Sequence, residues 1–176
     1  MADPLADPLA DPLEGDGRRL VLLRHSKSAW PPDTADIDRD LAARGRRDAP
    51  AVGRWLRRNL PAIDLAVCSP AVRARRTWAL ASAQLDVVPP DREDDRLYGA
   101  TAGDLMQVTC ELPASATTVV LVGHNPGLEH FLALLSGAAE MLKTSALAVL
   151  GTAVTDWSQA APGSWTLRTL ETPRGE

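Results

Sequence analysis

The chain has 176 residues, of which 45% are hydrophobic and 24% are charged, and its formal net charge is −4 at pH 7. This length fits one domain with a core of its own, and the composition is typical of globular proteins. The longest apolar run, residues 131–142, is interrupted by Glu140 and is shorter than the ~20 residues that span a bilayer, so we predict no membrane segment.

The N-terminal segment repeats the tetrapeptide Ala-Asp-Pro-Leu three times. A proline at every fourth position removes backbone donors and disfavours a helix. The segment also lacks the basic start and apolar centre of a secretory signal. We therefore predict that residues 1–17 form a disordered tail, that residues 18–176 form a single domain, and that the protein is cytoplasmic.

The charge of the chain is divided unevenly between this tail and the rest. The tail contains five acidic residues and no basic one, whereas the rest has 19 basic and 18 acidic residues and is close to neutral. A near-neutral body lacks the broad basic surface with which proteins bind nucleic acid. We expect no nucleic-acid partner, and we interpret local basic clusters such as RGRRDAPAVGRWLRR mainly as solvated helix faces.

Hydrophobic periodicity predicts strands and helices that alternate along the chain. Strands are expected at residues 20–23, 64–69 and 117–123, and helices at 43–59, 70–84, 101–112 and 126–137. A charged, proline-rich loop is expected at 87–100, and two further strands at 145–154 and 163–171. This alternation predicts an α/β fold, a three-layer α/β/α sandwich with a largely parallel central sheet, to which the last two strands add a hairpin or an edge strand.

Polar residues that could bind a ligand follow the predicted strands. Arg24 and His25 come directly after the first buried strand. After the second strand, we expect Ser69 to be the N-cap of a helix with Pro70 at its first position, which places Arg73 in or just past the first turn. A helix N-terminus favours anions, so Arg73 would stand where a phosphate can bind.

The strand at 117–123 ends in the same way. His124 follows it directly, with Asn125 expected as the N-cap and Pro126 at the first helical position. Ligand sites of parallel sheets lie at the carboxyl ends of strands. The sequence therefore predicts a cationic pocket of Arg24, His25, Arg73 and His124, in which the arginines bind phosphate oxygens and a histidine acts as donor or nucleophile.

Metal binding is the competing use of the histidines. The chain has three, and His25 shares its pocket with arginine charge that would repel a cation, while His130 is expected to point away from the site. Cys68 and Cys110 have neither disulfide-framework nor zinc-site spacing and are expected to be buried small hydrophobic residues. We expect no metal site and no cofactor.

The segments around these residues resemble one known family. LVLLRHSKSAW, DIDRDLAARGRRDAP, CSPAVRARRTW, RLYGATAGDLM and VLVGHNPGLE occur in the order found in branch 1 of the histidine phosphatase superfamily, which also holds the cofactor-dependent phosphoglycerate mutases. The compact SixA-type phosphohistidine phosphatases are the most similar group, and the resemblance spans about residues 19–172. It implies a phosphoglycerate mutase-like fold and a hydrolase without cofactor.

The resemblance also implies a role for each residue of the pocket. His25 would be the nucleophile that takes the phosphoryl group as a phosphohistidine intermediate. Arg24, Arg73 and His124 would hold the phosphate oxygens and stabilise the transferring group. This agrees with phosphoryl-transfer chemistry, which asks the protein mainly for positioning and for positive charge on the equatorial oxygens.

The chain departs from the family pattern at two positions. Ser26 replaces the glycine of the Arg-His-Gly signature, as small residues often do in the SixA-like group. Where larger relatives place a carboxylate that protonates the leaving oxygen, this chain has Tyr98. Other carboxylates remain open for that role: Glu93, Asp94 and Asp95 in the charged loop, and Asp33, Asp36 and Asp38 after the signature. The sequence does not assign the acid.

The missing acid bears on which class of phosphate the protein hydrolyses. The leaving nitrogen of a phosphoramidate can already carry a proton, so it depends less on a general acid than an alkyl ester does. We therefore expect a phosphatase that acts on phosphohistidine in proteins. The alternatives are a small-metabolite phosphomonoesterase of the same fold and a non-catalytic phosphate-binding module. Lys27 and Trp30 could line the rim of the pocket, or be a solvated lysine and a packed loop tryptophan.

Overall fold

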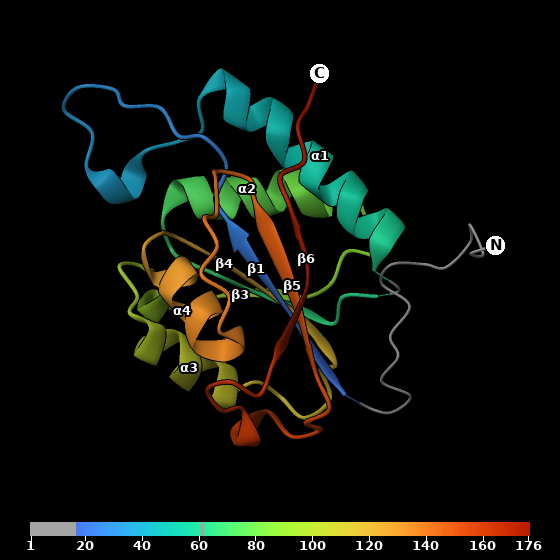
Figure 1. Cartoon of the computed structure of the whole chain (residues 1–176). Coiled ribbons are helices and arrows are strands. Elements are labelled where there is room, and N and C mark those ends of the chain that lie inside the picture. Colours follow the sequence, from blue (N-terminus) through green and yellow to red (C-terminus); the bar gives the residue numbers. More distant parts are fainter. Residues whose placement is uncertain (1–16, 61) are drawn as a thin grey trace.

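The computed structural model describes residues 17–60 and 62–176, which form one sheet between two pairs of helices (Figure 1). Of the predicted disordered tail, residues 1–17, all but Gly17 lies outside the described residues. Among the described helices, none is long and apolar enough to cross a membrane.

The central sheet has six strands in the order β3-β2-β4-β1-β5-β6. Their bounds are Arg18–Arg24 (β1), Leu65–Cys68 (β2), Asp91–Glu93 (β3), Thr118–Gly123 (β4), Leu147–Thr152 (β5) and Thr166–Glu171 (β6). The pairs β1–β4, β2–β4 and β2–β3 are parallel, whereas β5 runs antiparallel to both β1 and β6. The predicted largely parallel sheet, with an antiparallel final pair and β6 at the edge, is confirmed.

Two helices cover each face of this sheet. Their bounds are Ala43–Asn59 (α1), Val72–Ser82 (α2), Ala102–Cys110 (α3) and Gly127–Ser136 (α4), and short 3-10 turns occur at Asp36–Asp38, Asp95–Leu97 and Trp157–Gln159. Alternate strand residues point to opposite faces. Accordingly, Val21 and Leu23 of β1 join a core cluster with α1 and α2, while Leu20 and Leu22 join a second cluster with α3 and α4. The three-layer sandwich is confirmed.

The predicted helix starts are right for α1 and α3 and wrong for α2 and α4. Helix α1 starts at Ala43, and α3 follows Thr101, which is its N-cap and forms a capping box with Asp104. Ser69 is not an N-cap, because α2 starts only at Val72 after Ala71. Asn125 is not an N-cap either, because α4 starts at Gly127 and the Asn125 side chain donates to other partners. In both cases the helix starts later than predicted, and the polar residue lies in the loop before it.

Two smaller expectations also change. Part of the predicted charged loop is strand β3, whose three residues are exposed and which pairs only with β2, so its polar sequence has no hydrophobic periodicity. Cys68 is buried as expected, but Cys110 is only half-buried and its thiol faces the Ala160 carbonyl. Both cysteines are free.

The parallel pairing brings three strand ends to one edge of the sheet. Arg24 at the end of β1 lies beside Gly123 at the end of β4, and Cys68 at the end of β2 lies beside Val122. The residues that follow these strands therefore meet at that edge, above the buried core.

Close contact between α1 and α2 depends on a glycine. A Cβ at Gly53 would collide with the Ala81 carbonyl oxygen, whereas a Cβ at Gly103 in α3 has only the Thr101 hydroxyl nearby, at 3.6 Å. We predict that Gly53→Ala lowers the free energy of unfolding by about 1–3 kcal/mol through overpacking, whereas the control Gly103→Ala raises it by up to ~1 kcal/mol through helix propensity. Urea denaturation measures both, and equal stability of the two variants would contradict this packing.

Candidate active site

The four residues predicted for the pocket, Arg24, His25, Arg73 and His124, come together at the edge of the sheet. The His25 and His124 ring centroids are 4.9 Å apart. A pocket of about 180 Å³ opens between them. Its lining residues are Arg24, His25, Lys27, Ser28, Trp30, Arg39, Arg73, His124, Asn125 and Thr144. Four of these are Lys or Arg and none is a carboxylate, so the pocket suits an anion.

The tautomer of His25 is fixed by its own backbone neighbour. Nδ1 lies 2.8 Å from the Ser26 carbonyl oxygen, which can only accept a hydrogen bond. Nδ1 must therefore carry the proton, and in the neutral ring Nε2 keeps its lone pair. The side chain is only 8% exposed, so its orientation is set by packing as well.

The backbone around His25 is held from two sides. The Ser26 N–H donates to the Thr77 hydroxyl, and that hydroxyl donates to the Arg73 carbonyl, so the loop after β1 is tied to α2. On the other side, the Ser145 hydroxyl donates to the Ser26 hydroxyl. Ser26 is thus fully buried and bonded. The serine in place of the signature glycine adds a hydrogen bond here.

Both histidines are neutral in the physiological pH range. Burial, with smaller contributions from the nearby His124, Arg73 and Arg24, lowers the pKa of His25 to about 3, although the hydrogen bond to Ser26 acts in the opposite direction. Burial, followed by the charge of Arg73, lowers the pKa of His124 to about 4. A neutral imidazole keeps a lone pair, which is what a nucleophile requires.

The two predicted arginines are fixed by different partners. Arg24 donates from Nη1 to the Leu142 carbonyl at 2.7 Å, while its buried Nε has no hydrogen-bond partner among the described residues. Arg73, at the start of α2, donates to both the carbonyl and the carboxylate of Asp36, the latter at 2.9 Å. Both guanidinium groups are therefore held in place at the mouth of the pocket.

His124 is joined to a residue that the sequence assigned another role. Its Nε2 lies 2.7 Å from the Ser69 hydroxyl, and its buried Nδ1 has no partner within the described part of the chain. Tyr98 packs edge-on against the His124 ring, with centroids 5.7 Å apart. Ser69 thus orients His124 instead of capping α2.

One of the open carboxylates, Asp36, belongs to the site. It accepts hydrogen bonds from the Tyr98 hydroxyl at 2.8 Å, from Arg39 at 2.6 Å and from Arg73. The bond from Tyr98, together with those from Arg39 and Arg73, lowers the pKa of Asp36 to about 2. Asp36 is therefore ionised at neutral pH and has no proton to give to a leaving group.

Arg39 was not predicted as a site residue, and Asp36 was one of several carboxylates without an assigned role. Arg39 is buried, donates to the Ala29 carbonyl and the Ser28 hydroxyl, and lies under the exposed Trp30 ring, 3.2 Å from its centroid. Both residues stand in a polar loop without periodicity, and an alternating charge pattern there is typical of solvated loops. Lys27 and Trp30 line the pocket, which confirms the first of their two interpretations.

The third histidine of the chain, His130, lies away from the pocket. His130 is exposed on α4 and does not line the pocket. In residues 17–60 and 62–176, no group of three or more His, Cys, Asp or Glu side chains is placed to hold a metal ion. The positive charge in this pocket is supplied by arginine and lysine side chains.

Comparison with known proteins places this geometry in a family. A model of the histidine phosphatase superfamily (branch 1) matches residues 20–115. An uncharacterised protein of Mycobacterium tuberculosis is 41% identical over 163 residues, which cover 86% of this chain and 100% of that protein.

Two solved structures are also similar. The first is a protein of Nakamurella multipartitia, provisionally named as the phosphohistidine phosphatase SixA, with a TM-score of 0.77 and 32% identity over 89% of this chain and 96% of that one. The second, from Agrobacterium tumefaciens and provisionally given the same name, has a TM-score of 0.74 and 26% identity over 89% of this chain and 98% of that one. The chain belongs to branch 1 of the histidine phosphatase superfamily, and its compact fold is of the SixA type.

Proposed function

We propose that the protein is a metal-independent phosphatase that acts on phosphohistidine in other proteins through a phosphohistidine intermediate of its own. The observation that supports this most strongly is the tautomer of His25. The bond from Nδ1–H to the Ser26 carbonyl leaves a lone pair on Nε2, in a pocket lined with cations. The proposed nucleophile therefore lies inside a pocket that can bind an anionic phosphoryl group.

In the first step, the Nε2 lone pair of His25 attacks phosphorus while the bond from phosphorus to the leaving nitrogen breaks. The bonding electrons stay on that nitrogen, and the substrate imidazole leaves neutral because its other nitrogen carries a proton. The phosphorylated His25 ring gains positive charge, which its Nδ1–H shares with the Ser26 carbonyl. In the second step, a water oxygen attacks phosphorus while the phosphorus–Nε2 bond breaks. The bonding electrons return to Nε2, so His25 is neutral again, and both water protons leave on the dihydrogen phosphate product.

The surrounding cations supply the stabilisation that phosphoryl transfer needs. Arg24 and Arg73 have guanidinium groups that match phosphate oxygens, and the free capacity of Arg24 Nε and His124 Nδ1 would be filled by such oxygens. When Ser69 donates its hydroxyl proton to His124 Nε2, Nδ1 is the protonated nitrogen. Because these groups neutralise the transferring phosphoryl group, we propose that no metal takes part.

The ionised state of Asp36 supports the choice of substrate. With Asp36 unable to give a proton and Tyr98 bonded to it, the described residues that line the pocket include no carboxylic acid for an alkyl leaving group. A phosphoramidate depends least on such an acid. The small pocket, about 180 Å³, holds a phosphoryl group and a ring at its mouth, which suits a side chain presented by a protein surface.

Labelling with a phosphohistidine protein tests the nucleophile. We predict that acid-free denaturation of the wild type during turnover traps a base-stable, acid-labile phosphate on the enzyme itself. The variant His25→Ala should trap none and lose at least ~1,000-fold in kcat/KM. His130→Ala is the matched control and should keep both label and activity, because His130 is exposed and outside the pocket. A labelled His25→Ala protein would show that another residue is the nucleophile.

Substrate preference tests the missing acid. We predict that kcat/KM falls in the order phosphohistidine peptide, aryl phosphate, alkyl phosphate, with at least ~100-fold between the first and the last, because leaving-group protonation matters increasingly along that series. The assay is phosphate release with EDTA present throughout. Faster hydrolysis of an alkyl phosphate would favour the small-metabolite phosphatase, and no hydrolysis of any substrate would favour the binding module.

The depressed pKa values of the two histidines predict how stability depends on pH. A native state that holds His25 and His124 neutral binds fewer protons than the unfolded chain, so stability falls as pH drops below ~6.5 towards pH 4. We predict that His25→Gln removes about 2–3 kcal/mol of the loss between pH 7 and pH 4.5. Urea denaturation at both pH values measures this, and the exposed His130→Gln control should behave like the wild type.

A further inference from the structure

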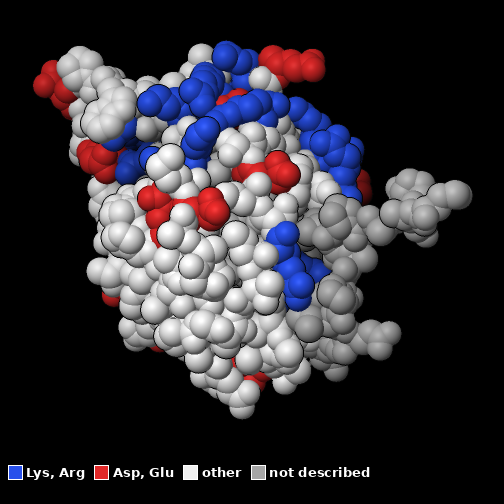
Figure 2. Space-filling model, viewed as in Figure 1, with Lys and Arg blue, Asp and Glu red and all other residues white. Residues whose placement is uncertain are grey.

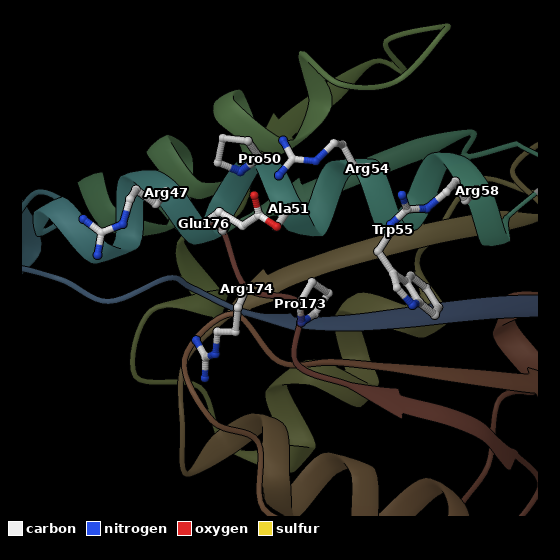
Figure 3. A pocket seen from close by; sticks show the side chains of 10 residues that line it. Arg47, Pro50, Ala51, Arg54, Trp55, Arg58, Pro173, Arg174 and Glu176 are labelled. Carbon is white, nitrogen blue, oxygen red and sulfur yellow. The ribbon is translucent and has the colours of Figure 1, made fainter.

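A second, larger groove lies outside the active-site pocket, between α1 and the segment that follows β6 (Figure 3). It encloses about 740 Å³. Its lining residues are Arg47, Pro50, Ala51, Arg54, Trp55, Arg58, Pro173, Arg174, Gly175 and Glu176. Four of them are arginines and only Glu176 is acidic, so the groove is strongly cationic.

The wall opposite α1 is fixed by a buried carboxylate. The Asp48 carboxylate, on α1, accepts a hydrogen bond from the Gly175 N–H at 3.1 Å and forms an ion pair with Arg174 at 2.7 Å. The Asp48 side chain is only 3% exposed. Gly175 packs so closely on the helix that a Cβ there would collide with the Arg47 carbonyl oxygen. The groove therefore has helix α1 on one side and, on the other, the segment 173–176, which is attached to Asp48.

Three arginines of α1 face this groove without an acidic partner. Arg47, Arg54 and Arg58 are spaced i, i+7 and i+11, which places them in one row along the helix. Within the described residues none of the three forms an ion pair, whereas each of the other three arginines of α1 does. Figure 2 shows that Lys and Arg gather over α1. The charge of this row is free to bind an anionic ligand.

Arg174 of the groove contacts a residue that lines the active-site pocket. Arg174 donates to the Thr144 carbonyl at 3.1 Å, and Thr144 lines the pocket beside Lys27. At the start of α1, the Ala42 N–H donates to the Lys27 carbonyl at 2.9 Å. The groove and the active-site pocket are therefore neighbours, with Arg174 and the start of α1 between them.

We propose that this groove binds an acidic segment of the protein whose phosphohistidine enters the pocket. The row from Arg47 to Arg58 is about 16 Å long at 1.5 Å per residue, which matches about five residues of extended polypeptide. A nucleic acid fits less well, because the body of the chain is close to neutral and only one aromatic residue, Trp55, lines the groove. The proposal rests on the proposed function, since it names the partner of the same site.

The test compares two phosphohistidine peptides that differ only in five flanking residues, all Glu and Asp in one and all Gln and Asn in the other, placed before or after the phosphohistidine. We expect the wild type to show a KM at least tenfold lower for an acidic peptide at low salt, with the preference reduced in 0.3 M salt. The triple variant Arg47→Gln, Arg54→Gln, Arg58→Gln should lose that preference. The control double variant Arg75→Gln, Arg92→Gln, outside the groove, should keep it.

Hydrolysis of p-nitrophenyl phosphate separates this proposal from the proposed function. The triple variant should hydrolyse it with the wild-type kcat/KM within twofold, which also shows that the variant folds. If the wild type hydrolyses both peptides with equal KM, or if the triple variant keeps the preference, the groove is not the docking site although the protein is a phosphatase. If the wild type hydrolyses neither peptide, the substrate and the docking site are both wrong.

Discussion

The site depends on the parallel pairing of β4 with both β1 and β2. This register sets the carboxyl ends of three strands side by side, so that His25, the Ser69 loop and His124 emerge at one edge of the sheet. Several interacting pairs in the pocket join residues distant in sequence. The Ser69–His124 bond and the tie from Ser26 through Thr77 to Arg73 both exist because the sheet brings these loops together. A slip of one residue would turn these side chains to the wrong face.

Much of this arrangement could be predicted from the chain alone. The strands and helices follow from apolar periodicity, and the four pocket residues from their place at strand ends. What could not be predicted depends on contacts across the fold. Ser69 and Asn125 are residue types that often act as N-caps. In the folded chain, however, the Ser69 hydroxyl bonds to His124, and the Asn125 amide donates to the Glu129 carboxylate and the Leu142 carbonyl. Arg39 and Asp36 stand in a loop whose sequence resembles any charged loop, and only folding brings them to Arg73.

The electrostatics of the pocket fit its proposed chemistry from two directions. Burial and neighbouring cations lower the pKa of His25 to about 3, which keeps the nucleophile neutral while the same cations attract the phosphoryl group. Asp36, with its pKa of about 2, stays ionised in the bond from Tyr98 and holds Arg73. Among its described lining residues the pocket therefore provides a lone pair and positive charge but no carboxylic acid, which fits the proposed substrate, whose leaving group can arrive protonated. The arginine row of α1 is the surface that we propose extends this positive charge toward a partner protein.

The position of the phosphoryl group on the His25 ring shows whether Nε2 of this residue is the nucleophile. The hydrogen bond from Nδ1 to the Ser26 carbonyl leaves only Nε2 with a lone pair, so the trapped intermediate must be phosphorylated on Nε2. Phosphorus–nitrogen NMR on the denatured, ¹⁵N-labelled protein distinguishes the two ring isomers. We predict phosphate on Nε2 of His25. Phosphate on Nδ1, or on His124, would contradict the account of this site.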